Sequence, residues 1–510
     1  MSLTRRSAVR VLGAGALVLG IRMVAGAAAA DGDLRLVDAA RSQDWQAVRT
    51  LVNQRADVNV RSHDGGTALL WAAHWNDLDT ADLLIRAGAN ANAANDLRMT
   101  PLSRACTNGS AALVKRLLKA GADPNAPIAT GETPLMTCAG SGSADAVRLL
   151  IASGADVNAK EPLQNQNALM WAAAERHPDV IRTIIEDIEH RADLQARTKK
   201  GFTALHFAAR EGDLESTRIL LAAGVNVNTR SQPDPSEKGG GPSYNATISA
   251  GSTPLLVATV RGHVPLALFL LEHGADPNIG DAGFTPLHWA ATTWESGVAN
   301  PVFGFNDPMS GIPDRSAKLQ LVKSLLAHGA NPNVRVTRRP PGFAGGYSDS
   351  VGATPFLLAA AVADLEMMQL LLAAGADPAH ATRSNATPLL AAAGVNQRLG
   401  ESPVTEDQAI AAVTFLLRLG GSAKAVTTGG ENALFGPAYR GWNTLLQLLV
   451  DNGADVNAVS KAGITPWLAA SGLGDRLGGV NYNTETAALL VKLGADPKLG
   501  KPCQAQTRCR

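Results

Sequence analysis

Residues 100–132 read TPLSRACTNGSAALVKRLLKAGADPNAPIATGE, and this stretch contains the signals that decide the fold. Thr100 is suited to cap a helix by accepting a backbone N–H bond, and Pro101 follows where a backbone donor would have no partner. The apolar residues behind them predict two short helices, each with one apolar face. Gly121 is placed to end the second helix in a left-handed conformation, before the chain turns through a hairpin finger.

The same unit recurs along almost the whole chain. Many intervals between copies are 32 to 34 residues, and most copies close with a variant of Gly121-Ala122-Asp123-Pro124-Asn125. A degenerate first copy over residues 34–60 brings the number to twelve. The opening residues of the other eleven copies are Thr67, Thr100, Thr133, Asn167, Thr203, Thr253, Thr285, Thr354, Thr387, Asn432 and Thr465.

These units resemble the ankyrin repeat. The resemblance covers nearly all of residues 34–500, and a period near 33 residues with both an opening and a closing motif is highly specific. It implies an all-α solenoid of about twelve helix-turn-helix repeats with hairpin fingers. Since one repeat leaves its faces uncovered, stacking must supply the stability, and we expect an elongated molecule.

The repeats divide into a regular part, residues 34–230, and a part with long insertions, residues 231–500. Two insertions follow a closing motif and are expected to extend fingers, whereas three fall between the first and second helix of a repeat. Residues 501–510 form a polar tail that contains two cysteines. The insertions cover roughly residues 231–251, 295–315, 336–351, 394–406 and 472–484.

The first thirty residues have the features of an export signal. Arg5-Arg6 precede an apolar, Gly-rich run that ends in Ala27 to Ala30, and a cleavage site is expected between Ala27 and Asp31. The arginine pair resembles a twin-arginine signal, with general secretion as the alternative. Cleavage would remove four Arg and no acid, which changes the formal charge from +1 to −3. We expect a periplasmic or secreted protein without a stable membrane span.

Composition narrows the class of partner. The chain is 45% apolar and 18% charged, so it has ample material for a core. A formal charge of +1, with Lys and Arg spread along the chain, argues against a surface that tracks nucleic-acid phosphates. We expect a monomer that binds a protein partner and uses no cofactor.

The four cysteines fall into two pairs by position. Cys503 and Cys509 lie in the tail and are able to close a small loop in an oxidising compartment. Cys106 and Cys138 lie in the first helices of successive repeats, where other repeats mostly place Ala. Because neighbouring helices pack about 8 to 10 Å apart and a disulfide needs less than about 7 Å, we predict that Cys106 and Cys138 are buried and unpaired.

No motif for catalysis or metal binding emerges from the ten histidines. His206 and His288 occupy the fourth place of the Thr-Pro-Leu-His pattern, where the resemblance to ankyrin repeats implies a structural role. No catalytic, cofactor-binding or metal-binding residue is therefore assigned, and an enzyme is not expected. A hidden active site would have to bring His74 or His177 next to an acid.

Aromatic residues and arginines are the candidates for partner binding, because both are frequent at energetic hot spots. Trp71, Trp171 and Trp289 take the fifth place of the first helix, an expected core position. The resemblance to ankyrin repeats implies that later first-helix places point toward the concave groove, and the insertions are expected to frame it. Rings in long insertions are equally able to fold back over the solenoid. The predicted contact residues are Trp75, Trp294, Tyr439, Arg440, Phe303, Phe305, Arg338, Arg339, Phe343 and Tyr347.

The leading hypothesis is an exported scaffold that binds another protein through its concave groove, fingers and C-terminal-half insertions. The alternative is an enzyme or small-molecule-binding subunit with a pocket built by the insertions. A third possibility, shielding of a neighbouring periplasmic enzyme, is not separable by sequence from generic protein binding.

Overall fold

The computed structural model describes residues 33–187, 191–232, 250–292, 294–295, 312, 314–338, 340, 343–344, 347–397, 404–472 and 482–501. The expected export signal, Cys503 and Cys509 lie outside this part of the chain. Within it, no helix is long and apolar enough to cross a membrane.

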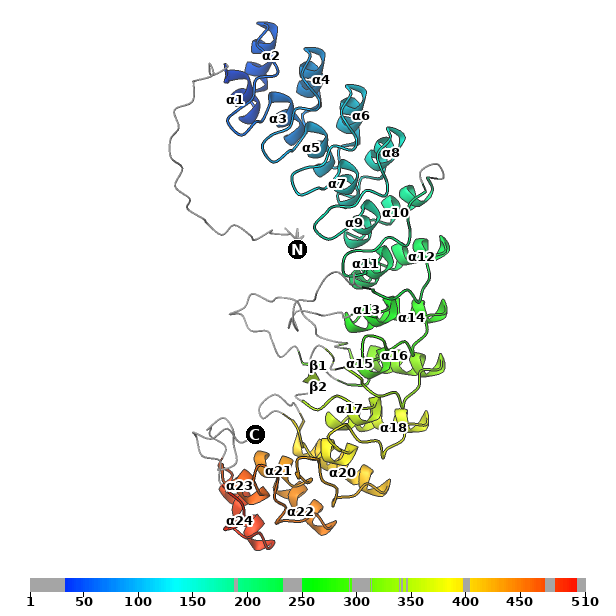
Figure 1. Ribbon diagram of the computed structural model, residues 1–510, viewed down its shortest axis with the longest axis vertical. Helices are drawn as coiled ribbons and strands as arrows, with labels where there is room; N and C mark the ends of the chain where they lie inside the picture. Colours follow the sequence, from blue (N-terminus) through cyan, green and yellow to red (C-terminus); the bar gives the residue numbers. More distant parts are fainter. Residues whose placement is uncertain are drawn as a thin grey trace.

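Helices alternate in pairs along a curved, elongated stack, which confirms the predicted α-solenoid of twelve repeats (Figure 1). The first helices are α1 (Arg35–Arg41), α3 (Ala68–His74), α5 (Pro101–Thr107), α7 (Pro134–Gly140), α9 (Ala168–Ala174), α11 (Ala204–Glu211), α13 (Pro254–Val260), α15 (Pro286–Ala290), α17 (Pro355–Ala361), α19 (Pro388–Ala392), α21 (Phe435–Arg440) and α23 (Pro466–Ala470). The second helices are α2 (Trp45–Asn53), α4 (Leu78–Arg86), α6 (Ala111–Lys119), α8 (Ala144–Ala152), α10 (Pro178–Ile185), α12 (Leu214–Ala222), α14 (Val264–Glu272), α16 (Arg315–Ala327), α18 (Leu365–Ala373), α20 (Glu406–Arg418), α22 (Asn443–Asp451) and α24 (Thr484–Lys492).

Every opening residue except Asn432 stands directly before its first helix, and eight of these ten side chains accept a backbone N–H bond as predicted. Thr67, for example, accepts the Leu70 N–H at 3.2 Å. The hydroxyls of Thr203 and Thr285 contact a histidine ring instead. In the exceptional repeat α21 begins only at Phe435, and the Asn432 side chain accepts from Leu434 N instead. Pro437 explains the shift, because it cannot donate to the carbonyl four residues earlier.

The histidines of the Thr-Pro-Leu-His pattern are structural, as predicted. The Nδ1 atom of His206 lies 2.9 Å from the Thr203 hydroxyl, and its Nε2 lies 3.0 Å from the Ser252 carbonyl of the next repeat. His288 makes the equivalent contacts with Thr285 and Val334. Burial lowers the pKa of each imidazole to about 4, so both rings are neutral at physiological pH.

Asparagines of the closing motif form a ladder between consecutive fingers. The Asn125 amide donates to the Gly154 carbonyl of the next repeat at 2.8 Å and accepts from Asp156 N at 2.8 Å. The same pair of bonds is made by Asn59, Asn92, Asn158, Asn228, Asn278, Asn333 and Asn457. The ladder therefore sets the spacing of the fingers independently of the helices.

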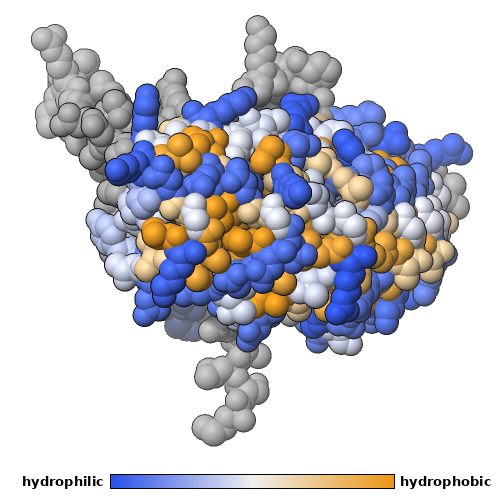
Figure 2. Space-filling view, turned by 90° about the horizontal axis from the view of Figure 1, so that it is seen from below, coloured by the Kyte–Doolittle hydropathy of each residue, from blue (hydrophilic) through white to orange (hydrophobic). Residues whose placement is uncertain are grey.

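The apolar interior is divided along the stack. One core extends from Leu36 to Val225, a second extends from Ala209 to Ala495, and a small third cluster includes Trp289 and Tyr347. Figure 2 looks onto the C-terminal end of the stack and shows hydrophobic residues in a band between hydrophilic ones. Within the last repeat, Val491 of α24 remains exposed.

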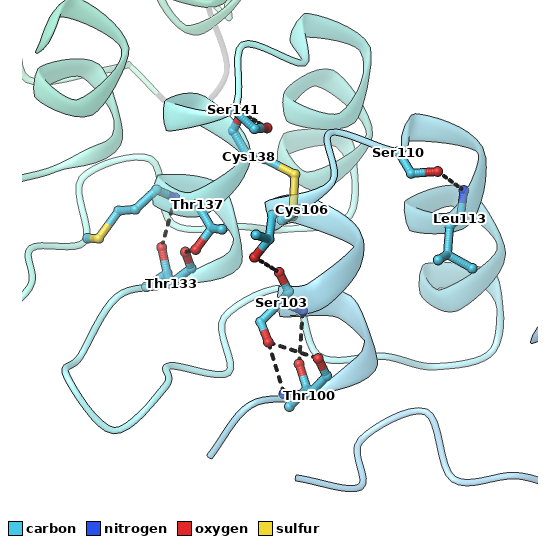
Figure 3. The surroundings of a disulfide bond; sticks show 11 residues. Thr100, Ser103, Cys106, Ser110, Leu113, Thr133, Thr137, Cys138 and Ser141 are labelled. Carbon is cyan, nitrogen blue, oxygen red and sulfur yellow. Dashed lines mark hydrogen bonds between the residues drawn. A yellow bond between two sulfur atoms is a disulfide. The ribbon is translucent and has the colours of Figure 1, made fainter. Parts of the chain in front are cut away.

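Cys106 and Cys138 are buried, as predicted, but the prediction that they are unpaired is wrong, because the two residues form a disulfide (Figure 3). Their Cα atoms are 4.4 Å apart. Small residues at the contact between α5 and α7, among them Ala105 and Ala139, let the two backbones approach more closely at this point than the average spacing of packed helices. The bond joins the third and fourth repeats.

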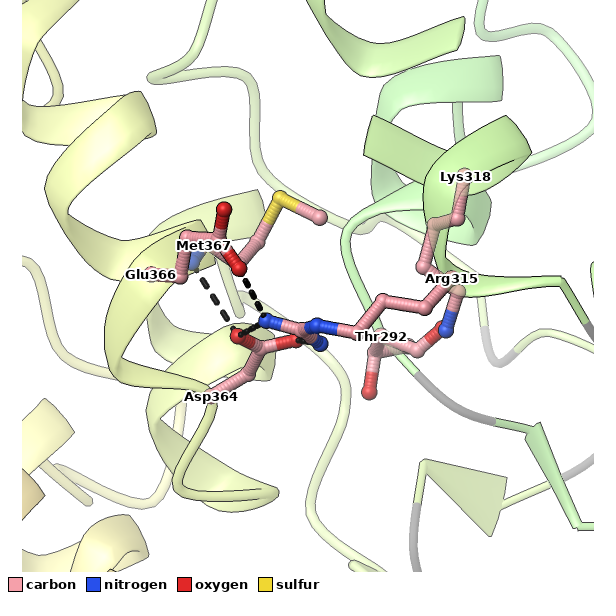
Figure 4. Close-up of polar contacts among 6 residues, drawn as sticks. All are labelled: Thr292, Arg315, Lys318, Asp364, Glu366 and Met367. Carbon is pink, nitrogen blue, oxygen red and sulfur yellow. Dashed lines mark hydrogen bonds and ion pairs between the residues drawn. The ribbon is translucent and has the colours of Figure 1, made fainter. Parts of the chain in front are cut away.

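An ion network connects α16 to the following repeat (Figure 4). Arg315 donates to both oxygens of Asp364 at 2.8 and 2.9 Å and to Glu366 at 2.7 Å. Asp364 also caps α18 by accepting from Met367 N. Close by, the Lys318 ammonium donates to the Thr292 carbonyl at 3.0 Å, just beyond the end of α15. These bonds hold both roots of the inter-helix insertion at residues 295–315.

Candidate functional site

The fingers and first helices line the inner, concave side of the arc, and the second helices form its outer side (Figure 1). Along the first helices, the fifth place of successive repeats carries Trp71, Arg104, Thr137, Trp171 and Phe207. All of these except Phe207 are partly exposed. The prediction that this place belongs to the core therefore holds for Trp289, which is 1% exposed, but Trp71 and Trp171 form part of the inner surface.

Aromatic and basic side chains gather at the inner side of the first three repeats. The Arg41 guanidinium lies 5.3 Å from the Trp71 ring centre, and His74 makes edge contacts with Trp71 at 5.5 Å and with Trp75 at 4.6 Å. Trp75 Nε1 donates to the Arg41 carbonyl at 3.2 Å. The residue is nevertheless 41% exposed. Trp75 is thus exposed on this side of the stack, and its role as a contact residue stays a prediction.

In the fifth repeat, the Trp171 ring packs against α7. A Cβ atom added at Gly140 would lie 3.0 Å from the Trp171 ring, so the absence of a side chain at Gly140 lets the indole lie close to the neighbouring helix.

The inner side of the C-terminal half is arranged differently, because insertions from different repeats meet there. Strand β1 (Trp294–Glu295) pairs antiparallel with β2 (Phe343–Ala344), with Trp294 opposite Ala344. Tyr347 forms a β-bridge with Gln397, and Ser348 N donates to the Asn396 carbonyl at 2.9 Å. The finger insertion at 336–351 thus connects the two inter-helix insertions on either side of it.

Tyr347 does not occupy the exposed position expected for a contact residue. It is 1% exposed and packs in the third apolar cluster with Phe284, Trp289 and Leu358. Burial and the charge of Asp349 raise the pKa of the Tyr347 phenol well above its ordinary value. The ring covers the solenoid because the neighbouring first helices present large apolar side chains beneath it.

Arg338 lies on the edge formed by the fingers. Its guanidinium donates to the Asp281 carbonyl at 2.6 Å and to the Ala250 carbonyl at 3.4 Å. The neighbouring Arg230 pairs with the Asp281 carboxylate at 2.9 Å. A shallow hollow of about 340 Å³ opens between the two arginines, so Arg338 is exposed while being held in place by backbone acceptors.

Arg440 is half-buried beneath an insertion. It donates to the Gly394 carbonyl at 3.3 Å and to Gln397 Oε1 at 2.8 Å, and it stacks 4.9 Å from the Trp442 ring centre. Burial lowers the pKa of Arg440 to about 10. The neighbouring Tyr439 is partly buried against the second core. Arg440 therefore supports the insertion that begins at residue 394.

Several predicted contact residues are not placed. Phe303, Phe305 and Arg339 lie outside the described residues, and the side chains of Trp294 and Phe343 are likewise outside them. For these five residues the assignment stays a prediction.

The two histidines that would reveal a hidden active site have other neighbours. His74 contacts Trp71 and Trp75, and burial together with the charge of Arg104 lowers its pKa. His177 Nε2 lies 3.1 Å from the Gly140 carbonyl. Among the described residues, no three or more His, Cys, Asp or Glu side chains are grouped closely enough to hold a metal ion.

Family models match the chain over most of its repeats. A model for three ankyrin repeats matches residues 36–128, 77–161, 114–197, 135–231 and 238–299, and a model for one ankyrin repeat matches residues 351–383. The matches cover more than half of the chain. The chain belongs to the ankyrin-repeat family.

Curated relatives share parts of this ankyrin-repeat chain. Protein PhlB of Serratia liquefaciens is 33% identical over 138 residues, which are 26% of this chain and 52% of PhlB. The human palmitoyltransferase ZDHHC13 is 31% identical over 106 residues, which cover 21% of this chain and 14% of the relative. Alpha-latrotoxin-Lg1a of Latrodectus geometricus is 31% identical over 122 residues, or 23% and 8% of the two chains. The chain thus spans about half the length of PhlB and much less of the other two.

Sequence reasoning missed two exposed leucines of the ankyrin fingers. Leu97 is 63% exposed and Leu163 is 68% exposed, each at the tip of a finger in the regular half. The sequence contained a signal for these leucines, because the corresponding finger positions of other repeats carry polar residues: Asp64, Thr130 and Lys200.

Proposed function

We propose that this ankyrin-repeat chain is an exported scaffold that binds another protein through its concave inner face. One observation carries the proposal: the inner face of the regular half exposes Trp75, Leu97 and Leu163 on a framework held by packed helices and the asparagine ladder. Large apolar side chains on a rigid support suit a protein partner, because little conformational entropy is lost when they are covered.

The insertions of the C-terminal half contribute a second part of the proposed surface. Three of them, those that begin at residues 295, 336 and 394, are joined by the pairing of β1 with β2 and by the bridge at Tyr347, and we propose that these three act as one rim. Arg338, Arg339, Phe303, Phe305 and Phe343 belong to this rim in the proposal, and Trp294, Tyr439 and Arg440 support it from the groove side. Tyr347 is left out of the contact set because it is buried.

Scaffolding is favoured over catalysis by the surroundings of the histidines. Ankyrin-repeat proteins are typically non-enzymatic, and His74 contacts two indole rings instead of an acid. His177 contacts a backbone carbonyl. A general acid–base pair needs two titratable groups within hydrogen-bonding reach of one substrate, which neither histidine supplies.

Export to the periplasm or outside the cell is part of the proposal. The arginine pair at Arg5-Arg6 and the alanines before Asp31 support it, and so does the disulfide between Cys106 and Cys138, since such bonds persist in oxidising compartments. We expect the mature chain to begin between residues 28 and 31 and the Arg5→Lys, Arg6→Lys variant to stay in the cytoplasm. Full export of that variant would leave only general secretion.

Photo-crosslinking in the native host tests the scaffold. A photoreactive amino acid is placed at Leu97 or Leu163, and at Lys115 on the outer side as the matched control. We expect a defined protein adduct from the two finger positions and none from Lys115. Adducts from Lys115 alone, or none from any position, would show that the inner face binds no protein.

A second experiment tests whether the insertions contact the partner or only cover the solenoid. Residues 295–315 and 336–351 are each replaced by a short Gly-Ser turn. The melting temperature and the yield of the photo-crosslinked adduct are then measured on the same preparations. Loss of the adduct with unchanged melting would support a contact role for the insertions. An unchanged adduct with a large loss of melting temperature would assign them a covering role.

A further inference from the structure

Five side chains from the first three repeats form a compact patch on the inner face: Arg41, Trp71, His74, Trp75 and Arg104. We call it the tryptophan–arginine patch. Arg41 covers the Trp71 ring, His74 lies between the two indoles, and Trp75 is bonded to the backbone of Arg41. The contacts cross from α1 to α3, so the patch is held by two repeats.

Arg104 completes the patch on α5, at the place that Trp71 takes on α3. Its guanidinium is half-buried, and within the described part of the chain it makes no hydrogen bond or ion pair. Partial burial also lowers its pKa, and its charge acts on His74. A desolvated cation without an acceptor is unfavourable in the free protein and favours a ligand that brings a negative charge.

The other charges in the patch do not compensate Arg104. Arg41 has one acidic neighbour, Asp64, at 4.0 Å, which is the outer limit of an ion pair. Both of these side chains are largely exposed, so their mutual attraction is weak. The patch as a whole is therefore positive and is bordered by exposed aromatic surface.

The inner face of the regular half, like the patch, carries more positive than negative charges. The fingers and first helices of the second to sixth repeats contain nine Lys and Arg but six Asp and Glu. The second helices and closing loops of the same repeats contain eight basic and twelve acidic described residues. The inner segments are 60–75, 93–108, 126–141, 159–176 and 196–211, and the outer segments are 76–92, 109–125, 142–158, 177–195 and 212–228.

We propose that the tryptophan–arginine patch docks an acidic segment of a protein partner, with a carboxylate placed against Arg104 and an adjacent apolar side chain against Trp75. This inference rests on the proposed scaffold function and names the chemistry of its partner. Charge complementarity to the inner face steers the segment toward the groove, and the indole surface supplies apolar contact once it arrives.

An acidic protein segment suits this face better than a nucleic acid does. Carboxylates stand among the cations, including Asp64 and Asp96 on consecutive fingers, and they would repel a regular row of phosphates. Binding to nucleic acid requires several clustered cations that neutralise successive phosphates. A single unpaired guanidinium beside indoles instead matches one carboxylate and one apolar group.

Selection from a library of random linear peptides tests the proposal with the full chain as bait. Peptides enriched on the wild-type chain are sequenced, and the binding of individual peptides is measured by fluorescence anisotropy. The variants are Arg104→Glu, Arg104→Gln and Trp75→Ala. Lys115→Glu is the matched control, since it makes the same charge change on the outer side of the adjacent helix.

We expect the enriched peptides to carry Asp or Glu next to an aromatic or aliphatic residue. Arg104→Glu and Trp75→Ala should each weaken them by about tenfold or more, and Lys115→Glu by less than about twofold. Affinity should also fall with rising salt, because part of the attraction is between exposed charges. Arg104→Gln replaces Arg104→Glu if the reversed charge lowers the melting temperature.

Three results would overturn the proposal: no enrichment, enrichment of neutral or basic peptides, or acidic peptides whose affinity is unchanged by both patch variants. Competition by a single-stranded oligonucleotide at equal charge would assign the patch to nucleic acid instead. The scaffold function is judged separately. If the adducts from Leu97 and Leu163 persist in Arg104→Glu, the chain binds a protein without using this patch.

Discussion

The backbone conformation of one residue after the second helix decides where each repeat turns. Gly121 ends α6 with φ of 82°, and a Cβ atom there would have nothing within 4 Å. The glycine is therefore needed for its left-handed conformation and not for space. Arg55 and Arg191 stand at the equivalent places with φ of 63° and 35°, so the hairpin geometry is kept there although an arginine must adopt an unfavourable conformation.

Arg55→Gly should stabilise the first repeat by roughly 0.5–1 kcal/mol, because glycine adopts the left-handed conformation without steric cost. Native-state hydrogen exchange of α2 reports the change locally. The opposite substitution, Gly121→Ala, should destabilise the third repeat by about 1 kcal/mol. Unchanged exchange in both variants would mean that neither position carries backbone strain.

The buried histidines make stability depend on pH. The pKa of His206 and of His288 is about 4 in the folded chain and about 6.5 when unfolded. Between these values the unfolded chain binds more protons, so the stabilisation is complete above about pH 6.5 and is lost as the pH falls toward 4. The expected loss is on the order of 3 kcal/mol for each histidine across this window.

The double variant His206→Gln, His288→Gln isolates this contribution, because glutamine at the same place is able to complete the capping box without titrating. We expect its denaturation midpoint to change less between pH 7 and pH 4 than that of the wild-type chain. Carboxylates contribute equally to both proteins at the acidic end. Parallel pH profiles would refute the assignment of buried, neutral imidazoles.

Between elements, the asparagine ladder joins one finger to the next. It uses both groups of the Asn side chain, and its partners are a left-handed glycine carbonyl and an amide two residues later. Besides Lys498 of the last repeat, three positions lack the asparagine: Gln195, Ala379 and Lys424. Within the described residues the corresponding bonds to the next repeat are not made, and two of these gaps are consecutive, near the C-terminal end.

Ala379→Asn should restore one rung of the ladder. The Ala379 N–H already bonds to the Asp377 carboxylate at 2.8 Å, as the Asn125 N–H does to Asp123 at 2.9 Å, so the local backbone matches. The new amide is expected to bond to Gly420 O and Ser422 N and to stabilise the tenth repeat by about 1 kcal/mol. Asn125→Ala should cost a similar amount in the fourth repeat, and hydrogen exchange of α20 and α8 measures the two effects.

At the scale of the whole molecule, stability is distributed along one dimension, because the helices of each repeat pack mainly against those of the adjacent repeats. The division of the interior into two long cores near the sixth repeat follows from this arrangement. The disulfide between Cys106 and Cys138 lies inside the first of these cores and links two repeats covalently. The disulfide is therefore expected to stabilise the regular half, where the proposed binding face lies.

Replacing both cysteines by Ala should lower the stability of the regular half by about 3–4 kcal/mol, since the bond closes a loop of 32 residues in the unfolded chain. Ala fits both places, because Ala73 and Ala172 stand at the equivalent positions and are buried. Denaturant unfolding of the variant is compared with the oxidised and reduced wild-type chain. Equal midpoints for the oxidised chain and the variant would show that the bond adds nothing.

Most of the architecture was predictable from the sequence, because its causes are local. Thr67 and Thr100 cap helices through their own backbone neighbours, and Gly121 turns the chain through its own φ angle. The periodic apolar residues then leave stacking as the way to bury each repeat. The number of repeats and the structural role of His206 both followed from these local rules.

Only the tertiary structure decided what depends on distances between repeats. The pairing of Cys106 with Cys138 depends on how closely two helices approach, and the burial of Tyr347 depends on which insertions meet above Trp289. The tryptophan–arginine patch likewise combines side chains more than sixty residues apart in sequence, from Arg41 to Arg104. Local patterns specify each repeat, whereas the curvature and packing of the stack determine which of these side chains lie together and which remain exposed.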